Sequence, residues 1–101
     1  MDKQFKSFAE FYPFYLTEHT NIVNRRLHFF GKIALLLVII LFVLTLSWQL
    51  LIAIPIVGYG FSWIGHFFFE RNKPAAFGNP LYSFIGDCVM AKDIITGKIK
   101  F

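Results

Sequence analysis

The sequence contains a single cysteine, Cys88. One cysteine can form neither an intramolecular disulfide nor a Cys-x-x-Cys zinc site, and we expect Cys88 to be an ordinary buried small residue. The chain also has no glycine-rich phosphate loop, no Gly-x-Ser-x-Gly motif and no recognisable cysteine–histidine nucleophile setting. The sequence therefore carries no signal for nucleotide-dependent or covalent hydrolytic chemistry.

Formal charge is scarce as well. Charged residues make up 16% of the chain, whereas soluble domains carry about 25%. No charged residue occurs in the 37 positions between Lys32 and Glu70, and 56% of all residues are hydrophobic, including 14 phenylalanines. A soluble chain of this size could not bury so much apolar surface. We therefore expect an integral membrane protein.

The uncharged run is too long for one bilayer crossing and long enough for two crossings of about 20 residues each. Its polar patch, Thr45, Ser47 and Gln49, lies at the midpoint between two histidines. We predict a first crossing at 29–46 and a second at 50–69, joined by a turn at this patch.

The basic residues flank the apolar run, and the predicted turn has no charge. The positive-inside rule then predicts that both termini are cytoplasmic, at the plasma or inner membrane in a bacterium or the endoplasmic reticulum in a eukaryote. The flanking cations favour membrane lipid as a partner. They form no basic stripe, so we expect no nucleic-acid binding.

Amphipathic helices are expected on both sides of the hairpin. Segment 1–28 combines a polar block at 19–28 with upstream aromatics that share one helix face in the membrane interface, and Pro13 should bend or restart this helix. Residues 71–80 are rich in proline and glycine and indicate a loop, and 81–96 has a helical apolar stripe. The predicted fold is all-α: one membrane domain, 1–101, made of a helical hairpin with flanking interfacial or inserted helices.

The three histidines lie near one predicted membrane face. His28 opens the first crossing and His66 closes the second, so the hairpin brings them to the same depth. His19 is nine residues from His28, on the opposite face of a straight helix, and can join them only if the chain bends. Neutral imidazole suits iron, zinc, copper and nickel. The alternative is that each histidine hydrogen-bonds a headgroup or a nearby side chain.

Carboxylates and cations near the same face are further candidates. Glu70 lies four residues after His66, as a ligand or as an acceptor orienting that ring, unless it pairs with a neighbouring cation. Asp87 borders the stripe of 81–96 and is the better candidate for a ligand, unless it caps the helix. Arg25, Arg26 and Lys73 suit a carboxylate or phosphate headgroup, unless they only set the topology.

Three blocks resemble a family of small membrane proteins that includes a fungal 2-hydroxy fatty acid dioxygenase of fatty acid α-oxidation. The blocks are YLTEHTNIVNRRLHFFG (15–31), GYGFSWIGHFFFERNKPAAFGNPLYSFIGD (58–87) and MAKDIITGK (90–98). They cover nearly everything outside the first crossing.

The resemblance implies an Fe²⁺-dependent reaction of a 2-hydroxy fatty acid with O₂ that gives CO₂ and a fatty acid shortened by one carbon. It implies that the catalytic, metal-binding residues are His19, His28 and His66, with Asp87 as a further ligand. Supporting or substrate-binding positions would be Glu18, Asn21, Asn24, Arg25, Glu70, Asn72 and Lys73. The acyl tail would lie along the glycine-rich second crossing.

Two other functions fit the same residues. A non-catalytic membrane protein would use the hairpin as a scaffold and the polar blocks to bind lipid headgroups. A haem protein would hold its cofactor between His28 and His66. A hairpin this small exposes much helix surface, so a homodimer is plausible.

Overall fold

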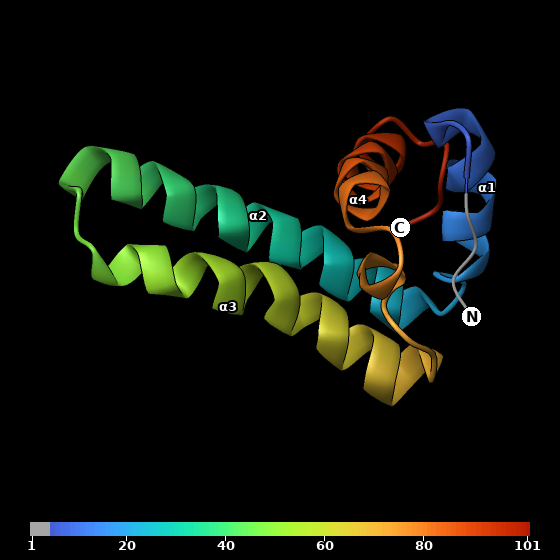
Figure 1. Ribbon diagram of the computed structural model, residues 1–101, viewed down its shortest axis with the longest axis horizontal. Helices are drawn as coiled ribbons and strands as arrows, with labels where there is room; N and C mark the ends of the chain where they lie inside the picture. Colours follow the sequence, from blue (N-terminus) through green and yellow to red (C-terminus); the bar gives the residue numbers. More distant parts are fainter. Residues whose placement is uncertain (1–4) are drawn as a thin grey trace.

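A computed structural model describes residues 5–101, apart from the side chain of Ala76. All regular elements in this part of the chain are helical, which confirms the predicted fold class. Figure 1 shows a long antiparallel hairpin, with two shorter helices gathered at the end away from its turn. The elements are α1 (Phe8–Thr17), α2 (Ile22–Thr45), α3 (Gln49–Ile64), the π-helix η1 (Gly65–Glu70), the 3₁₀ turn η2 (Ala75–Phe77) and α4 (Pro80–Ile95).

The hairpin arms are α2 on one side and α3 continued by η1 on the other. α2 begins seven residues before the expected first crossing, because the side chain of Asn21 caps it by accepting from the backbone N–H groups of Val23 and Asn24. It ends at Thr45, and the next residue, Leu46, has a left-handed conformation (φ 56°) that starts the turn at the expected polar patch. The second arm spans Gln49–Glu70, one residue more at each end than the expected 50–69.

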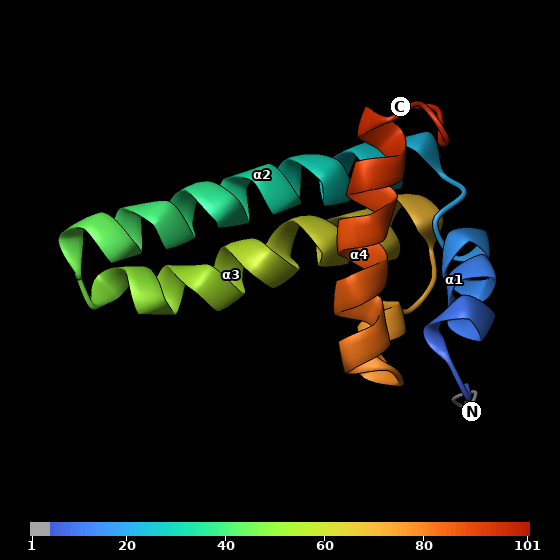
Figure 2. The same cartoon turned by 90° about the horizontal axis from the view of Figure 1, so that it is seen from above.

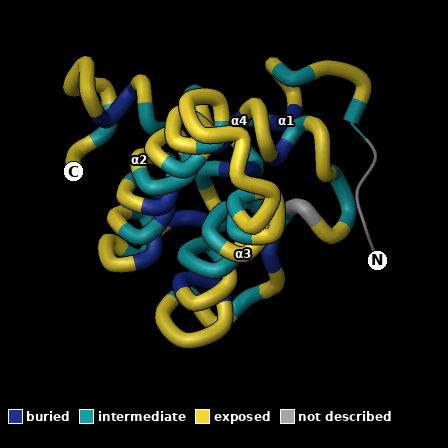
Figure 3. Tube along the Cα trace, turned by 90° about the vertical axis from the view of Figure 1, so that its left-hand side faces the viewer, coloured by how far each residue is buried: buried dark blue, intermediate teal, exposed yellow. Residues whose placement is uncertain are grey.

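Both arms are long and apolar enough to span a membrane. The 24 residues of α2 extend roughly 36 Å, against a hydrocarbon core of about 30 Å. Only 11% of the most apolar window of each arm is buried inside the protein, whereas a core helix of a soluble protein is mostly buried. Figure 3 shows exposed residues over the outside of the hairpin and buried ones where the helices meet.

α1 packs part of its aromatic face against α4, although this face was expected to lie in the membrane interface. Phe11 and Tyr15 are almost fully buried and form a small core with Met90 and Ile94 of α4. The helix also continues through Pro13 rather than restarting there. The aromatic face is covered because α4 supplies it with a protein partner. The expected segment's residues 1–4 lie outside the described residues.

α4 buries its more polar face. Figure 2 shows that it runs across the base of the hairpin, alongside α1. Its apolar stripe points outward, with Leu81 and Phe84 more than half exposed, and Cys88 is exposed rather than buried as expected. The buried positions are Ser83, Gly86, Asp87, Met90, Asp93 and Ile94. The exposed apolar stripe of α4 extends the apolar surface of the hairpin. The buried polar residues of α4 point into the base of the fold, the end of the hairpin away from its turn.

The hairpin closes tightly at Gly31, which is buried against α3. A Cβ atom added there would lie 2.7 Å from Cβ of Phe61, closer than packed carbons approach. Gly60, on the facing helix, has nothing within 4 Å of the corresponding position.

We expect Gly31→Ala to lower the free energy of unfolding by about 1–3 kcal/mol, because the extra methyl overpacks the α2–α3 contact. Gly60→Ala is the matched control and should be neutral or slightly stabilising. Thermal unfolding of the detergent-purified variants, followed by the helical circular dichroism signal, compares them. Equal melting temperatures for the two variants would contradict this packing of the hairpin.

Candidate metal centre

The chain bends sharply between α1 and α2, and Glu70 holds the bend. Its carboxylate accepts hydrogen bonds from the Thr20 backbone N–H (3.2 Å) and hydroxyl (2.7 Å). It also accepts from the Asn21 backbone N–H (2.8 Å) and the Asn24 amide (3.1 Å). Glu70 therefore neither orients the His66 ring nor pairs with Arg71 or Lys73, as the sequence suggested. It fastens the end of the second arm to the start of the first.

This bend is what the histidine spacing required. His19 lies in the connection after α1, and His28 lies nearly two turns into α2. With the chain turned back between them, their ring centroids are 4.5 Å apart. The sequence established that a bend was needed but not that a carboxylate 50 residues later would hold it.

His66 reaches the other two histidines from the π-helix η1. A π-helix widens the turn of the backbone, and such segments are frequent at functional sites. The preceding Gly65 lies against Asn24 of α2 so closely that no Cβ atom would fit. This close approach lets η1 place His66 beside the first arm.

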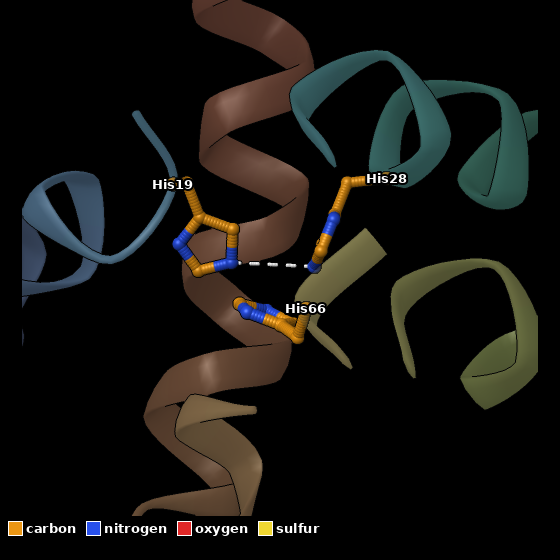
Figure 4. A group of neighbouring side chains, drawn as sticks. All are labelled: His19, His28 and His66. Atoms are coloured by element: carbon orange, nitrogen blue, oxygen red, sulfur yellow. Dashed lines mark hydrogen bonds between the residues drawn. The ribbon is translucent and has the colours of Figure 1, made fainter. Parts of the chain in front are cut away.

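The three imidazole rings form one compact, buried cluster (Figure 4). Their side chains come from three different segments and point toward one another, and each residue is at most 4% exposed. The ring centroids of His19 and His28 each lie within 4.9 Å of that of His66. One nitrogen from each ring can be chosen so that all three lie within 4.8 Å of one another. The histidines are therefore close enough to bind one metal ion.

A hydrogen bond at Nδ1 determines which nitrogen of each histidine ring carries a proton. Nδ1 of His19 contacts the Tyr15 carbonyl oxygen at 2.6 Å, and Nδ1 of His28 contacts the Asn24 carbonyl oxygen at 2.9 Å. A carbonyl oxygen can only accept, so both Nδ1 atoms carry the proton. In a neutral ring, Nε2 then keeps its lone pair.

Asn72 fixes the third ring in the same way. Its amide nitrogen donates to the Glu18 carbonyl oxygen at 3.1 Å, so its Oδ1 is the atom that faces Nδ1 of His66 at 2.6 Å. Oδ1 can only accept, and His66 is therefore also protonated at Nδ1. Partners that hold a ring through its other nitrogen are typical of metal-ligating histidines.

The Nε2 atoms of His19 and His28 lie close together in the cluster. Burial, together with the nearby His28 and His66, holds the pKa of His19 well below its usual range, so His19 is neutral at neutral pH. Nε2 of His19 and Nε2 of His28 are 3.2 Å apart (dashed line in Figure 4). Where neither Nε2 carries a proton, the two lone pairs face each other and repel, and a shared proton or metal ion removes the repulsion. Two nitrogens that each bind one ion at about 2.1 Å are separated by such a distance.

A porphyrin does not fit the same cluster. Haem held by His28 and His66 would have to pass between their rings, whose centroids are 4.9 Å apart. The His19 ring contacts both of them edge to face. The geometry favours a single ion over the haem that the sequence left open.

Asp87 lies near the three histidines, but both of its carboxylate oxygens contact other residues. Its Oδ2 pairs with the Lys32 ammonium at 3.1 Å, and its Oδ1 accepts from the Tyr15 hydroxyl at 3.3 Å. Burial and the nearby Asp87 carboxylate raise the pKa of Tyr15, which keeps this hydroxyl protonated. The Tyr15 ring stacks on the His19 ring, with centroids 4.0 Å apart. Asp87 thus contacts the cluster through Tyr15 instead of pointing a free carboxylate into it.

A cavity of about 400 Å³ extends from the histidines between the hairpin arms and α4, within the size range of roughly 300–1,000 Å³ typical of small-molecule sites. All three histidines line it. Its walls toward the hairpin turn are mainly apolar and include Leu35, Ile54, Pro55, Gly58 and Tyr59. The arrangement places a polar, histidine-rich end next to an apolar channel.

The cation in this cavity is Lys32, which sequence reasoning passed over as a topology determinant. Lys32 follows His28 by four residues, so the two share a helix face, and this spacing was the available signal. The sequence favoured Arg25 and Lys73 for binding a carboxylate. Arg25 instead donates to the Lys100 carbonyl oxygen (3.1 Å), Lys73 is exposed, and neither lines the cavity.

Asn72→Ala should weaken metal binding by about 10- to 100-fold, because the His66 ring loses the acceptor that orients it. Asn79→Ala is the matched control, since the Asn79 side chain makes no capping hydrogen bond and lies outside the cavity. Anaerobic titration of both purified variants with Fe²⁺ measures the affinities. Equal affinities would contradict a role for Asn72 in positioning His66.

Comparison with known proteins identifies the family. Residues 5–99 match the family described as 2-hydroxy-palmitic acid dioxygenase Mpo1-like. No curated protein and no solved structure matches the chain. The match covers nearly the whole sequence, including all three histidines and every residue that fixes their rings. The chain therefore belongs to the 2-hydroxy-palmitic acid dioxygenase Mpo1-like family.

Proposed function

We propose that this protein is an Fe²⁺-dependent dioxygenase that converts a 2-hydroxy fatty acid and O₂ into CO₂ and a fatty acid one carbon shorter. The observation that carries the proposal is the set of three buried imidazoles, each protonated at Nδ1, at the polar end of a largely apolar cavity. The family description, a 2-hydroxy-palmitic acid dioxygenase, supports the substrate class.

The reaction balances without a further reductant. A 2-hydroxy acid and O₂ give the shortened acid, CO₂ and water, and the bond between C1 and C2 breaks. The substrate loses four electrons, which is the number that O₂ accepts when it is fully reduced. A site for a nicotinamide or flavin is therefore not needed, in keeping with a sequence that has no nucleotide-binding motif.

His19, His28 and His66 would hold the iron, and Fe²⁺ would supply the electron chemistry that O₂ requires. The Tyr15 and Asn24 carbonyls and the Asn72 amide orient the rings and hold a proton on each Nδ1, which leaves Nε2 as the nitrogen available for the metal. The apolar part of the cavity would receive the acyl chain and exclude water from around that chain. Little protein is needed beyond this, because the metal and the substrate carry the chemistry.

The proposed enzyme works within a membrane. The exposed surfaces of α2 and α3 would contact lipid, and the cavity lies between these arms, where a fatty acid dissolved in the bilayer can reach it. We propose, from the positive-inside rule, that both termini and the histidine cluster lie at the cytoplasmic side.

His66→Ala should abolish both iron retention and turnover, because it removes one of three ligands. The purified full chain is loaded anaerobically with Fe²⁺, its metal content is measured, and it is then given 2-hydroxyhexadecanoic acid and O₂. We expect about one iron per chain and release of CO₂ with pentadecanoic acid from the parent protein, and neither from the variant.

Asn79→Ala serves again as the control and should match the parent. Full iron content and full activity in the His66→Ala variant would contradict the assignment of His66 as an iron ligand. No specific metal and no turnover in the parent would favour a lipid-binding or scaffolding protein. A Soret band in the absorption spectrum would indicate haem in place of non-haem iron.

A further inference from the structure

Among the described residues that line the cavity, Lys32 is the one lysine or arginine. It lies on α2, within a helix long and apolar enough to cross a membrane, and its side chain is 19% exposed. A charged residue in such a segment is unfavourable unless it is paired, and by default it marks a functional site. Asp87 provides the pairing, through Oδ2 at 3.1 Å.

The pairing leaves Lys32 able to bind a second anion. An ammonium group has three donors, and the contact with Asp87 takes one of them. The ammonium also lies 4.7 Å from the centre of the Phe84 ring, and Phe84 lines the same cavity. Lys32 is thus fixed at the cavity wall by two contacts from α4 while it retains hydrogen-bonding capacity.

Ser83 is a second, independent sign of a polar ligand. Its residue is only 7% exposed, and its hydroxyl oxygen is buried without a hydrogen-bond partner. Buried hydroxyls are normally satisfied, because leaving one unpaired costs free energy. Ser83 lines the cavity and lies one helical turn before Asp87 on α4, so it faces the same region as the Lys32–Asp87 pair.

We propose that Lys32 and Ser83 bind the carboxylate of the substrate and position it beside the histidine cluster. The assignment rests on the proposed function, since it names the groups that recognise the acid end of that substrate. The lysine supplies charge-assisted hydrogen bonds, the serine hydroxyl supplies one more donor, and Asp87 balances the lysine charge before substrate binds. The acyl chain then extends along the apolar walls formed by Leu35, Ile54 and Gly58.

This recognition makes the protein select free acids. A methyl ester has the same chain and the same 2-hydroxyl group but no charge for Lys32 to bind. The parent protein should therefore bind 2-hydroxyhexadecanoic acid about tenfold or more tightly than its methyl ester, because charge-assisted hydrogen bonds are the strong ones.

The test measures binding of both radiolabelled compounds to the full chain in lipid nanodiscs, anaerobically and at mildly alkaline pH, where the acid is ionised. Lys32→Met should lose most of the preference for the acid, Ser83→Ala should lose part of it, and Lys32→Arg should retain it. Lys98→Met is the matched control, because Lys98 is exposed and outside the cavity, and it should bind like the parent.

Asp87→Asn keeps the proposal testable where Lys32→Met does not fold. With its internal counterion removed, Lys32 should bind the acid at least as tightly as in the parent, whereas Lys32→Met should bind it more weakly. An unchanged acid preference in Lys32→Met, no preference in the parent, or loss of acid binding in Asp87→Asn would each overturn the proposal. Turnover with O₂, measured separately, decides the proposed function: a parent that selects the acid but releases no CO₂ refutes the reaction and leaves the carboxylate site standing.

Discussion

Three imidazole rings are each fixed through Nδ1 to an oxygen that can only accept, in a buried space where one nitrogen of each ring lies within 4.8 Å of the others. Unprotonated imidazole nitrogens held together in this way repel unless a proton or a metal ion lies among them. Several unusual local features serve this arrangement. The bend held by Glu70 returns the chain to His28, and the π-helix η1 carries His66 to the first arm. The cluster is thus a constraint around which the base of the fold is organised.

The protein has two regions that differ in which side chains they expose and which they bury. The hairpin exposes apolar side chains along its length, and the base of the fold buries polar ones. α4 shows both patterns in one helix, since Leu81 and Ile85 face outward while Ser83 and Asp87 face the cavity. A largely apolar cavity that connects the two regions suits a ligand with a polar head and an apolar tail. The histidines, Lys32 and Asp87 all lie at its polar end.

The sequence predicted the features that depend on distance along a helix. The uncharged run predicted two long apolar helices, its polar midpoint predicted the turn between them, and the expected hairpin predicted that His28 and His66 would meet. Features that depend on docking between distant segments were missed or misassigned. The role of Glu70 requires contacts with residues about 50 positions earlier, and the inward face of α4 depends on the packing of α1 against it. Periodicity locates an apolar stripe but does not say whether protein or lipid covers it, which is why Cys88 was expected to be buried.

The central claim is that one metal ion is bound by His19, His28 and His66. X-ray absorption spectroscopy of the purified chain, loaded anaerobically with Fe²⁺, tests it most directly because the signal comes from the ligands themselves. The account predicts nitrogen ligands about 2.1 Å from the iron, together with the scattering from more distant atoms that three bound imidazole rings produce. A loaded protein whose iron shows no imidazole scattering, or a chain that retains no iron, would contradict it.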